Sequence, residues 1–304
     1  MTSAAVFRTL RLRLHRALDG RLQGEHSGRR LGPGSDPEEV TPYRPGEDDV
    51  RRIDWNVTAR SLEPHVWRTR ADHEVETWVL VDETGSMAFG TTDLEKADLA
   101  RGATAAVGML TDGPANTVGV AHLRAGGVQW DRPLPGRHAA RRALRDPASS
   151  PTPVGGASLA DGLTRLQSRH GRPGLRVVIS DFLEPDGSII RPFSWEKALR
   201  RLARHRDTLV VEVLDPRELE LPDVGPVVLV DPESGHRCEV WTSIPSVRAR
   251  YAAAAATHRR EVAAAVRSSG AGHVVLRTDR DWVADLAAYL VRQRRTPAAP
   301  RRPR

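Results

Sequence analysis

Two short apolar runs, each followed at once by an aspartate, constrain the fold of this 304-residue chain most strongly. The first run, residues 78–81, ends at Asp82, and the largely apolar run 175–180 ends at Asp181. Such runs are typical of strands buried on both faces in a parallel sheet. Because the carboxyl ends of parallel strands share one edge of an open sheet, the two carboxylates are expected to meet there.

Segments typical of strands and helices alternate along most of the chain. Alternation of this kind predicts an α/β fold, a doubly wound and mostly parallel sheet with helices on both faces. The predicted strands are 77–81, 116–123, 127–130, 175–180, 208–214 and 273–276, with a small hairpin at 227–230 and 237–241. The predicted helices are 94–110, 137–145, 158–169, 195–204, 246–268 and 281–292.

Three regions follow from this pattern: an N-terminal extension (1–75), the α/β domain (76–292) and a disordered basic tail (293–304). Within the extension, residues 5–20 have the apolar spacing of an amphipathic helix, which we expect to pack on the domain; a membrane-surface helix is the alternative. Residues 24–42, rich in Gly, Pro and charge, indicate an irregular loop. Residues 64–72 indicate an extended segment.

Composition narrows the classes of function. The net charge is +7 and the pI about 10.5, yet the arginines are spread along the chain and aromatic residues make up only 5%. Surfaces for stacking bases are therefore scarce, and no nucleic-acid partner is expected. The sequence contains no apolar run of about 18 residues, no signal-peptide core and a single cysteine, Cys238. These features predict a cytoplasmic protein without a membrane span.

The segment after the first run carries oxygen-bearing side chains at every second position, Asp82, Thr84 and Ser86. In extended backbone such side chains point the same way. One carboxylate and two hydroxyls suit Mg²⁺ better than zinc or copper. The alternative is structural: Thr84 and Ser86 cap the following helix, while Asp82 and Asp181 accept hydrogen bonds from loop amides.

Residues 43–60, Tyr-Arg-Pro-Gly-Glu-Asp-Asp-Val-Arg-Arg-Ile-Asp-Trp-Asn-Val-Thr-Ala-Arg, form the most distinctive stretch. Together with the Asp-x-Thr-x-Ser pattern at 82–86, this stretch resembles the bacterial domain of unknown function 58 family. The resemblance implies a von Willebrand factor A-like domain that works with an AAA ATPase of the MoxR type. It also implies a metal-ion-dependent adhesion site formed by Asp82, Thr84, Ser86 and Asp181.

The same resemblance places a threonine ligand in a third loop, where the family reads Gly-Gly-Thr. Here Ala157 stands at that position, and Ser158, one residue later, is the tentative replacement. Four ligands would still hold Mg²⁺ with additional waters, since this ion commonly keeps several.

The 43–60 stretch has two interpretations. Ile53 and Trp55 look like packing anchors, and Asp54 could pair with Arg44 or Arg60, which favours a clamp that fastens the extension to the sheet. The alternative is a docking surface for the ATPase. In either case the residues concerned are Arg44, Asp48, Arg51, Asp54, Trp55 and Arg60.

The expected function is that of a non-enzymatic adaptor. It would bind a partner carboxylate through Mg²⁺ and act with the ATPase on a client protein. A Mg²⁺-dependent phosphohydrolase using Asp82 is the competing class, although position 84 is not the second acid of such enzymes. Arginine-mediated nucleic-acid binding is a weaker alternative. The chain has neither a phosphate-binding P-loop nor the serine elbow of α/β hydrolases.

Overall fold

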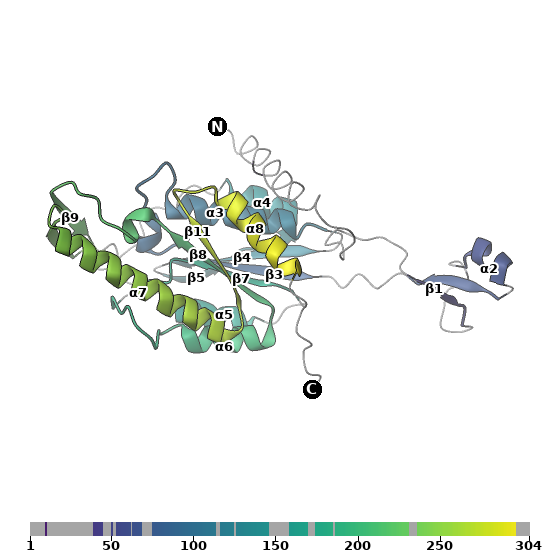
Figure 1. The fold of residues 1–304 in the computed structure, drawn as a ribbon. Helices are drawn as coiled ribbons and strands as arrows, with labels where there is room; N and C mark the ends of the chain where they lie inside the picture. The colour runs from purple at the N-terminus through teal and green to yellow at the C-terminus, as the bar shows by residue number, and fades with distance from the viewer. Residues whose placement is uncertain are drawn as a thin grey trace.

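A seven-stranded sheet organises the chain in the computed structural model (Figure 1). The structure describes Leu10 and residues 39–44, 50, 53–61, 63–68, 75–113, 116–124, 126–145, 158–169, 174–184, 186–230 and 236–295. Six strands follow the order β11-β8-β7-β3-β4-β5, and β6 pairs with β4. Their bounds are β3 (Glu76–Asp82), β4 (Thr117–Arg124), β5 (Gly127–Trp130), β6 (Leu134–Pro135), β7 (Arg176–Ser180), β8 (Thr208–Leu214) and β11 (Gly272–Arg277).

Five of these strands are parallel, and only β5 and β6 run antiparallel to β4. Helices cover both faces (Figure 1). One face carries α3 (Lys96–Leu110), α4 (Gly136–Ala143) and α8 (Trp282–Arg295), and the other carries α5 (Leu159–Ser168), α6 (Glu196–His205) and α7 (Pro245–Ser269). The predicted doubly wound α/β architecture is therefore confirmed.

Strand β3 shows why two separate cores form. Val79 and Val81 are buried with α3, α4 and α8, while Trp78 and Leu80 are buried with α5, α6 and α7. Successive side chains of a strand point to opposite faces, so an uninterrupted apolar run is what a central strand between two helical layers requires. The elements predicted between residues 76 and 292 are all present, with ends within three residues of those expected.

A long connection leaves the carboxyl end of β8 before the chain returns to the sheet. It contains the single turn η3 (Pro216–Glu218) and an antiparallel hairpin of β9 (Pro226–Val230) and β10 (Arg237–Trp241), as predicted. A second short turn, η2 (Gly85–Ala88), follows β3 directly. These connections begin at the sheet edge where Asp82 and Asp181 lie.

The N-terminal extension contains a small unit that sequence patterns predicted only in part. Strand β1 (Glu39–Pro42) pairs antiparallel with β2 (His65–Arg68), and helix α2 (Trp55–Ser61) lies between them in sequence. The prediction of irregular loop was wrong for the last four residues of 24–42, because their strand partner lies about 25 positions away and leaves no local signal.

Trp55 is not the buried anchor that was expected. It is the first residue of α2, and 70% of its surface is exposed. Asp54, which was expected to pair with Arg44 or Arg60, caps this helix: its Oδ1 accepts hydrogen bonds from the amides of Asn56 (2.8 Å) and Val57 (3.2 Å). The burial of Trp55, which favoured the clamp, was therefore predicted wrongly.

Several predictions concern residues outside the described part of the chain. These are the helix at 5–20 apart from Leu10, which is buried in the core beside α3, α4 and α8, most of the loop 24–42, Asp48, Arg51, residues 153–157 of the third loop and the tail beyond residue 295. Among the helices that the structure describes, none has the length and apolar character needed to cross a membrane.

Candidate functional site

The candidate site lies at the topological switch point of the sheet. The chain builds the sheet outwards from β3 in one direction and from β7 in the other, and these two strands are direct neighbours. Asp82 is the last residue of β3, and Asp181 directly follows β7. Both are buried, with 5% and 1% of their surface exposed. Open α/β sheets bind ligands at this point, beyond the carboxyl ends of the strands.

Asp82 is surrounded by neutral hydrogen-bond donors. Its Oδ1 accepts from the amide (3.0 Å) and the hydroxyl (2.7 Å) of Thr84, and its Oδ2 accepts from the hydroxyl of Ser180 (2.7 Å). Burial raises the pKa of the Asp82 carboxyl to about 6, and the nearby charge of Asp181 adds to this rise. The hydrogen bonds from Ser180 and Thr84 act in the opposite direction without cancelling it.

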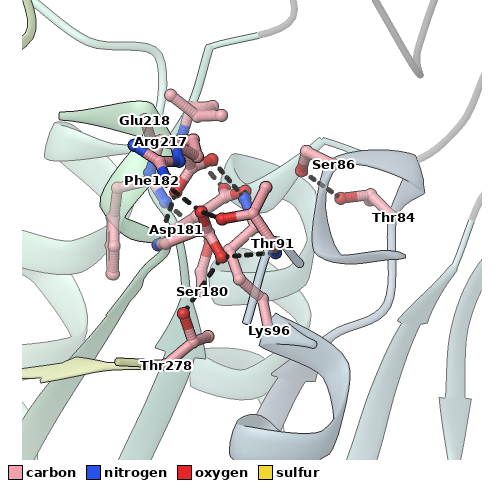
Figure 2. A network of polar contacts seen from close by, with 12 residues as sticks. Thr84, Ser86, Thr91, Lys96, Ser180, Asp181, Phe182, Arg217, Glu218 and Thr278 are labelled. Atoms are coloured by element: carbon pink, nitrogen blue, oxygen red, sulfur yellow. Dashed lines mark hydrogen bonds and ion pairs between the residues drawn. The ribbon is translucent and has the colours of Figure 1, made fainter. Parts of the chain in front are cut away.

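Two hydroxyls connect Asp82 to Asp181. The Oγ1 of Thr84 lies 3.3 Å from the Oγ of Ser86, and the Ser86 hydroxyl hydrogen-bonds the Asp181 carboxylate. Figure 2 shows Thr84 and Ser86 beside one another, next to Asp181 and the polar side chains around it. The structure thus brings the side-chain oxygens of the four residues expected from the sequence into one contiguous series, with each hydroxyl donating to one of the two carboxylates.

The side-chain oxygens of Asp82, Thr84 and Ser86 are suitable ligands for a small, hard cation. In an octahedron with Mg²⁺–oxygen distances of 2.0–2.1 Å, adjacent oxygens lie about 3 Å apart. The oxygen of Thr84 lies 2.7 Å from Asp82 and 3.3 Å from Ser86, on either side of that value. Within the described ranges no three His, Cys, Asp or Glu side chains are grouped to hold a metal. The hydroxyls would therefore have to complete the set.

Asp181 differs from Asp82 because it has a charged partner. Lys96, the first residue of α3, is fully buried, and its Nζ lies 2.7 Å from Asp181 Oδ2 and 2.5 Å from Glu218 Oε1 (Figure 2). Burial alone would raise the pKa of Asp181, but the charge and hydrogen bond of Lys96 outweigh burial and lower it. The pKa of Lys96 is raised, since its two carboxylates outweigh the cost of its own burial.

A third strand also ends in a buried aspartate. Asp215 follows β8, is fully buried and accepts hydrogen bonds from the Thr91 hydroxyl (2.6 Å) and the Thr278 hydroxyl (3.0 Å). Its amide donates to Glu218 Oε2 at 3.0 Å, which orients Glu218 towards Lys96. Neither Lys96 nor Asp215 was identified from the sequence. The repeated pattern of apolar strand followed by aspartate was the available signal for Asp215.

Helix α7 is connected to the same site through Arg259. The guanidinium of Arg259 donates to the carbonyl oxygen of Asp181 (3.0 Å) and to Glu212 Oε1 (2.7 Å). The other oxygen of Glu212 lies 2.7 Å from His273 Nε2. Arg259 is thus balanced by a buried acid, and its role is to hold the backbone at Asp181 against α7.

Ser158 has a structural task in this fold. It is the N-cap of α5, where its Oγ accepts from the amide of Asp161 (3.2 Å) and donates to the Asp161 carboxylate (3.0 Å). Its role as a metal ligand stays a prediction, since Ala157 and the rest of the third loop lie outside the described residues.

The remaining site residues expected from the sequence, among those described, belong to the small N-terminal unit. Arg44 and Arg60 are exposed, like Trp55, while Asp54 is partly buried at the start of α2. The docking surface and the clamp both stay predictions for this unit.

Comparisons with known proteins identify the family. The family model described as "Protein of unknown function DUF58" matches residues 39–261. Uncharacterized proteins of Mycobacterium tuberculosis and Mycobacterium bovis are each 45% identical over 298 residues, which covers 96% of this chain and 90% of theirs.

Among solved structures, the conserved hypothetical protein BatB of Bacteroides thetaiotaomicron matches with a TM-score of 0.44 and 15% identity over 73% of this chain and 100% of that one. The von Willebrand A domain of SpRpn10 matches with a TM-score of 0.37 and 17% identity over 73% of this chain and 95% of that one. The chain belongs to the domain of unknown function 58 family, as residues 43–60 predicted.

Proposed function

We propose that this chain is a non-enzymatic, cytoplasmic adaptor that binds the carboxylate of a partner protein through a Mg²⁺-dependent surface. The proposed partner is a MoxR-type AAA ATPase, with which the adaptor would act in the assembly or maturation of a client protein. The sequence of residues 43–60 is the support for this choice of ATPase. The chemistry at the switch point is the support for a cation and a carboxylate.

One observation carries the proposal: the side-chain oxygens of Asp82, Thr84, Ser86 and Asp181 form a contiguous series at the switch point, in which Thr84 donates to Asp82 and Ser86 donates to Asp181. The structural alternative is met in one half only, because Asp82 and Asp181 do accept from the amides of Thr84 and Leu183. Thr84 occupies the N-cap position of η2 but makes no capping hydrogen bond through its side chain. Its hydroxyl is directed at Asp82 instead, at 2.7 Å.

Each residue of the series has a distinct task. Asp82 supplies a carboxylate that no cationic side chain of the described residues contacts, and Ser180 fixes the direction of that carboxylate. Thr84 and Ser86 supply neutral oxygens, and Asp181 orients Ser86. When bound, Mg²⁺ would supply a positive charge with an open coordination position for a partner's Asp or Glu.

Co-precipitation with the ATPase tests the proposal at a constant Mg²⁺ concentration. We expect Asp82→Ala to weaken binding at least about tenfold, because it removes the site's uncompensated carboxylate. Glu220→Gln, a change at an exposed acid on the connection after β8, is the matched control and should bind normally. Circular dichroism of each variant establishes that it is folded.

The two parts of the proposal can fail separately. Unchanged binding by Asp82→Ala would remove the metal site from the mechanism, while absence of binding by the natural chain would remove the ATPase as partner. Turnover of a phosphomonoester that requires Mg²⁺ and Asp82 would contradict the non-enzymatic assignment.

A further inference from the structure

Lys96 is an unusual residue for this chain. Lysine and arginine together account for 46 residues of the sequence, but only Lys96 and Lys197 are lysines. Lys197 is exposed on α6, whereas Lys96 is completely buried between Asp181 and Glu218. The only buried ammonium among the described residues thus lies beside a residue of the candidate metal site.

The charges around Lys96 do not balance. Lys96 contacts Asp181 and Glu218, and Asp82 lies close enough to Asp181 to feel its charge, so these four groups sum to −2 when all are ionised. The buried Asp215, whose amide bonds Glu218, adds a further negative charge beside them. Arg259 does not change this sum, because Glu212 pairs with it. Without Lys96 the sum would be −3, and without the charge of Glu218 it would be −1.

Lys96 also restricts what Asp181 can do. Its ammonium is bonded to Oδ2, while Oδ1 accepts from the amide of Leu183 at 3.2 Å. Asp181 therefore has a partner on each oxygen before any ligand arrives. Asp82 accepts only from neutral groups, so its negative charge is the one left to attract a cation.

We propose that Lys96 is the built-in counter-cation of this site, a positioning residue that fixes Asp181 and lowers the affinity for a divalent cation. This inference rests on the proposed function and deepens it. With Lys96 in place, these four groups and a bound Mg²⁺ sum to zero, so Lys96 reduces the repulsion of an anionic partner. Without Lys96, the loaded site would stay negative and would oppose a partner's carboxylate.

Isothermal titration calorimetry with Mg²⁺ alone tests this role through two changes of opposite sign. We expect Lys96→Met to bind Mg²⁺ at least about tenfold more tightly and Glu218→Gln about tenfold more weakly, because they change the local charge by one unit in opposite directions. Lys197→Met and Glu220→Gln, both at exposed positions, are the matched controls and should stay within about twofold of the natural chain. A purely structural role would weaken binding in both site variants.

A measurement on the natural chain covers the case in which Lys96→Met does not fold. Lysine labelled with carbon-13 and nitrogen-15 gives signals from only two side chains. Titration with Mg²⁺ should shift the side-chain signal of Lys96 and leave that of Lys197 unchanged. Saturable Mg²⁺ binding without a shift at Lys96 would overturn the inference.

The outcomes separate this inference from the proposed function. If the natural chain binds Mg²⁺ and Lys96→Met binds no more tightly, Lys96 is not the counter-cation, although the adaptor proposal stands. If only Lys96→Met binds Mg²⁺, the inference holds and the metal part of the adaptor proposal fails. If neither binds, both are overturned.

Discussion

Asp82 and Asp181 occupy equivalent places in the fold and have opposite electrostatic properties. Each lies at the carboxyl end of a buried central strand, and both are almost fully buried. The pKa of Asp82 is raised to about 6, first by burial and then by the charge of Asp181. The pKa of Asp181 is lowered, because the ammonium of Lys96 outweighs the effect of burial.

The difference arises from what each neighbouring loop or helix contributes. On the β3 side, the donors to Asp82 are the neutral groups of Thr84 and Ser180. On the β7 side, the first turn of α3 brings Lys96 into contact with Asp181. The strands thus place the carboxylates, while their hydrogen-bond partners set the charge around each one. Among the described residues, a cationic side chain contacts Asp181 and none contacts Asp82.

The largest expected effect is on stability. Lys96→Met leaves the buried Asp181 and the partly buried Glu218 without their cation, and we expect it to lower the free energy of unfolding by about 3–5 kcal/mol at neutral pH. Denaturation in urea measures this. Lys197→Met should change stability by less than about 0.5 kcal/mol, because Lys197 is exposed. A similarly small change for Lys96→Met would show that the two aspartates do not differ as described.

Substitution of Asp82 should stabilise the protein, in contrast to substitution of Lys96. Asp82→Asn should raise the free energy of unfolding at pH 7 and above in metal-free buffer, by at most about 3 kcal/mol for a rise in pKa from 3.8 to about 6. The folded protein holds the Asp82 proton more tightly than the unfolded chain. The cost of ionising Asp82 is therefore fully present above about pH 6 and disappears as the pH falls towards 3.8.

Urea denaturation of Asp82→Asn and the natural chain between pH 4 and pH 8 checks this prediction. The two stability curves should diverge as the pH rises through about 6. Asp181→Asn is the informative companion, because it removes a carboxylate whose pKa is lowered and should destabilise the protein at pH 7. Destabilisation of equal size by both changes would contradict the comparison.

A smaller effect is expected for Ser180→Ala. The Ser180 hydroxyl donates to Asp82 at 2.7 Å and accepts from the Phe182 amide at 3.0 Å, so its removal should cost about 1–3 kcal/mol. It should also move the pKa of Asp82 upwards, because a hydrogen bond to the ionised form is lost. Carbon-13 NMR of labelled aspartate follows that pKa. A lowered value would show that Ser180 does not stabilise the carboxylate.

The smallest effects concern Thr84. Thr84→Val removes the hydroxyl that donates to Asp82 and should lower stability by about 1 kcal/mol, while Thr84→Ser keeps the hydroxyl and should stay within about 0.5 kcal/mol. Thermal unfolding of both variants measures the difference. Equal values would mean that this hydroxyl does not contribute to holding Asp82.

The sequence predicted the sheet well because its strands are fully buried and therefore apolar without interruption. It also predicted that Asp82 and Asp181 lie at one edge, since that follows from parallel topology. The burial of Lys96 could not be predicted from the sequence. The residue belongs to a helix, where a charged side chain is ordinarily expected to face solvent. Only its scarcity, one of two lysines among many arginines, set it apart.

Trp55 shows the opposite failure. A tryptophan beside an isoleucine suggested burial, yet Trp55 begins a short helix in a unit where Val66 is buried and α2 contributes no buried side chain. Residue type predicts burial only where enough chain folds over the residue, and the pairing of β1 with β2 is too local to cover it.

The most direct test is a crystal structure of the natural chain grown with Mn²⁺, a substitute for Mg²⁺ that scatters anomalously. We expect an anomalous peak among the side-chain oxygens of Asp82, Thr84 and Ser86. The oxygens that coordinate the ion should lie about 2.0–2.3 Å from the peak. Lys96 should remain bonded to Asp181 beside it. Ordered density for these side chains without an anomalous peak among them, at a Mn²⁺ concentration of several millimolar, would contradict the assignment of this site.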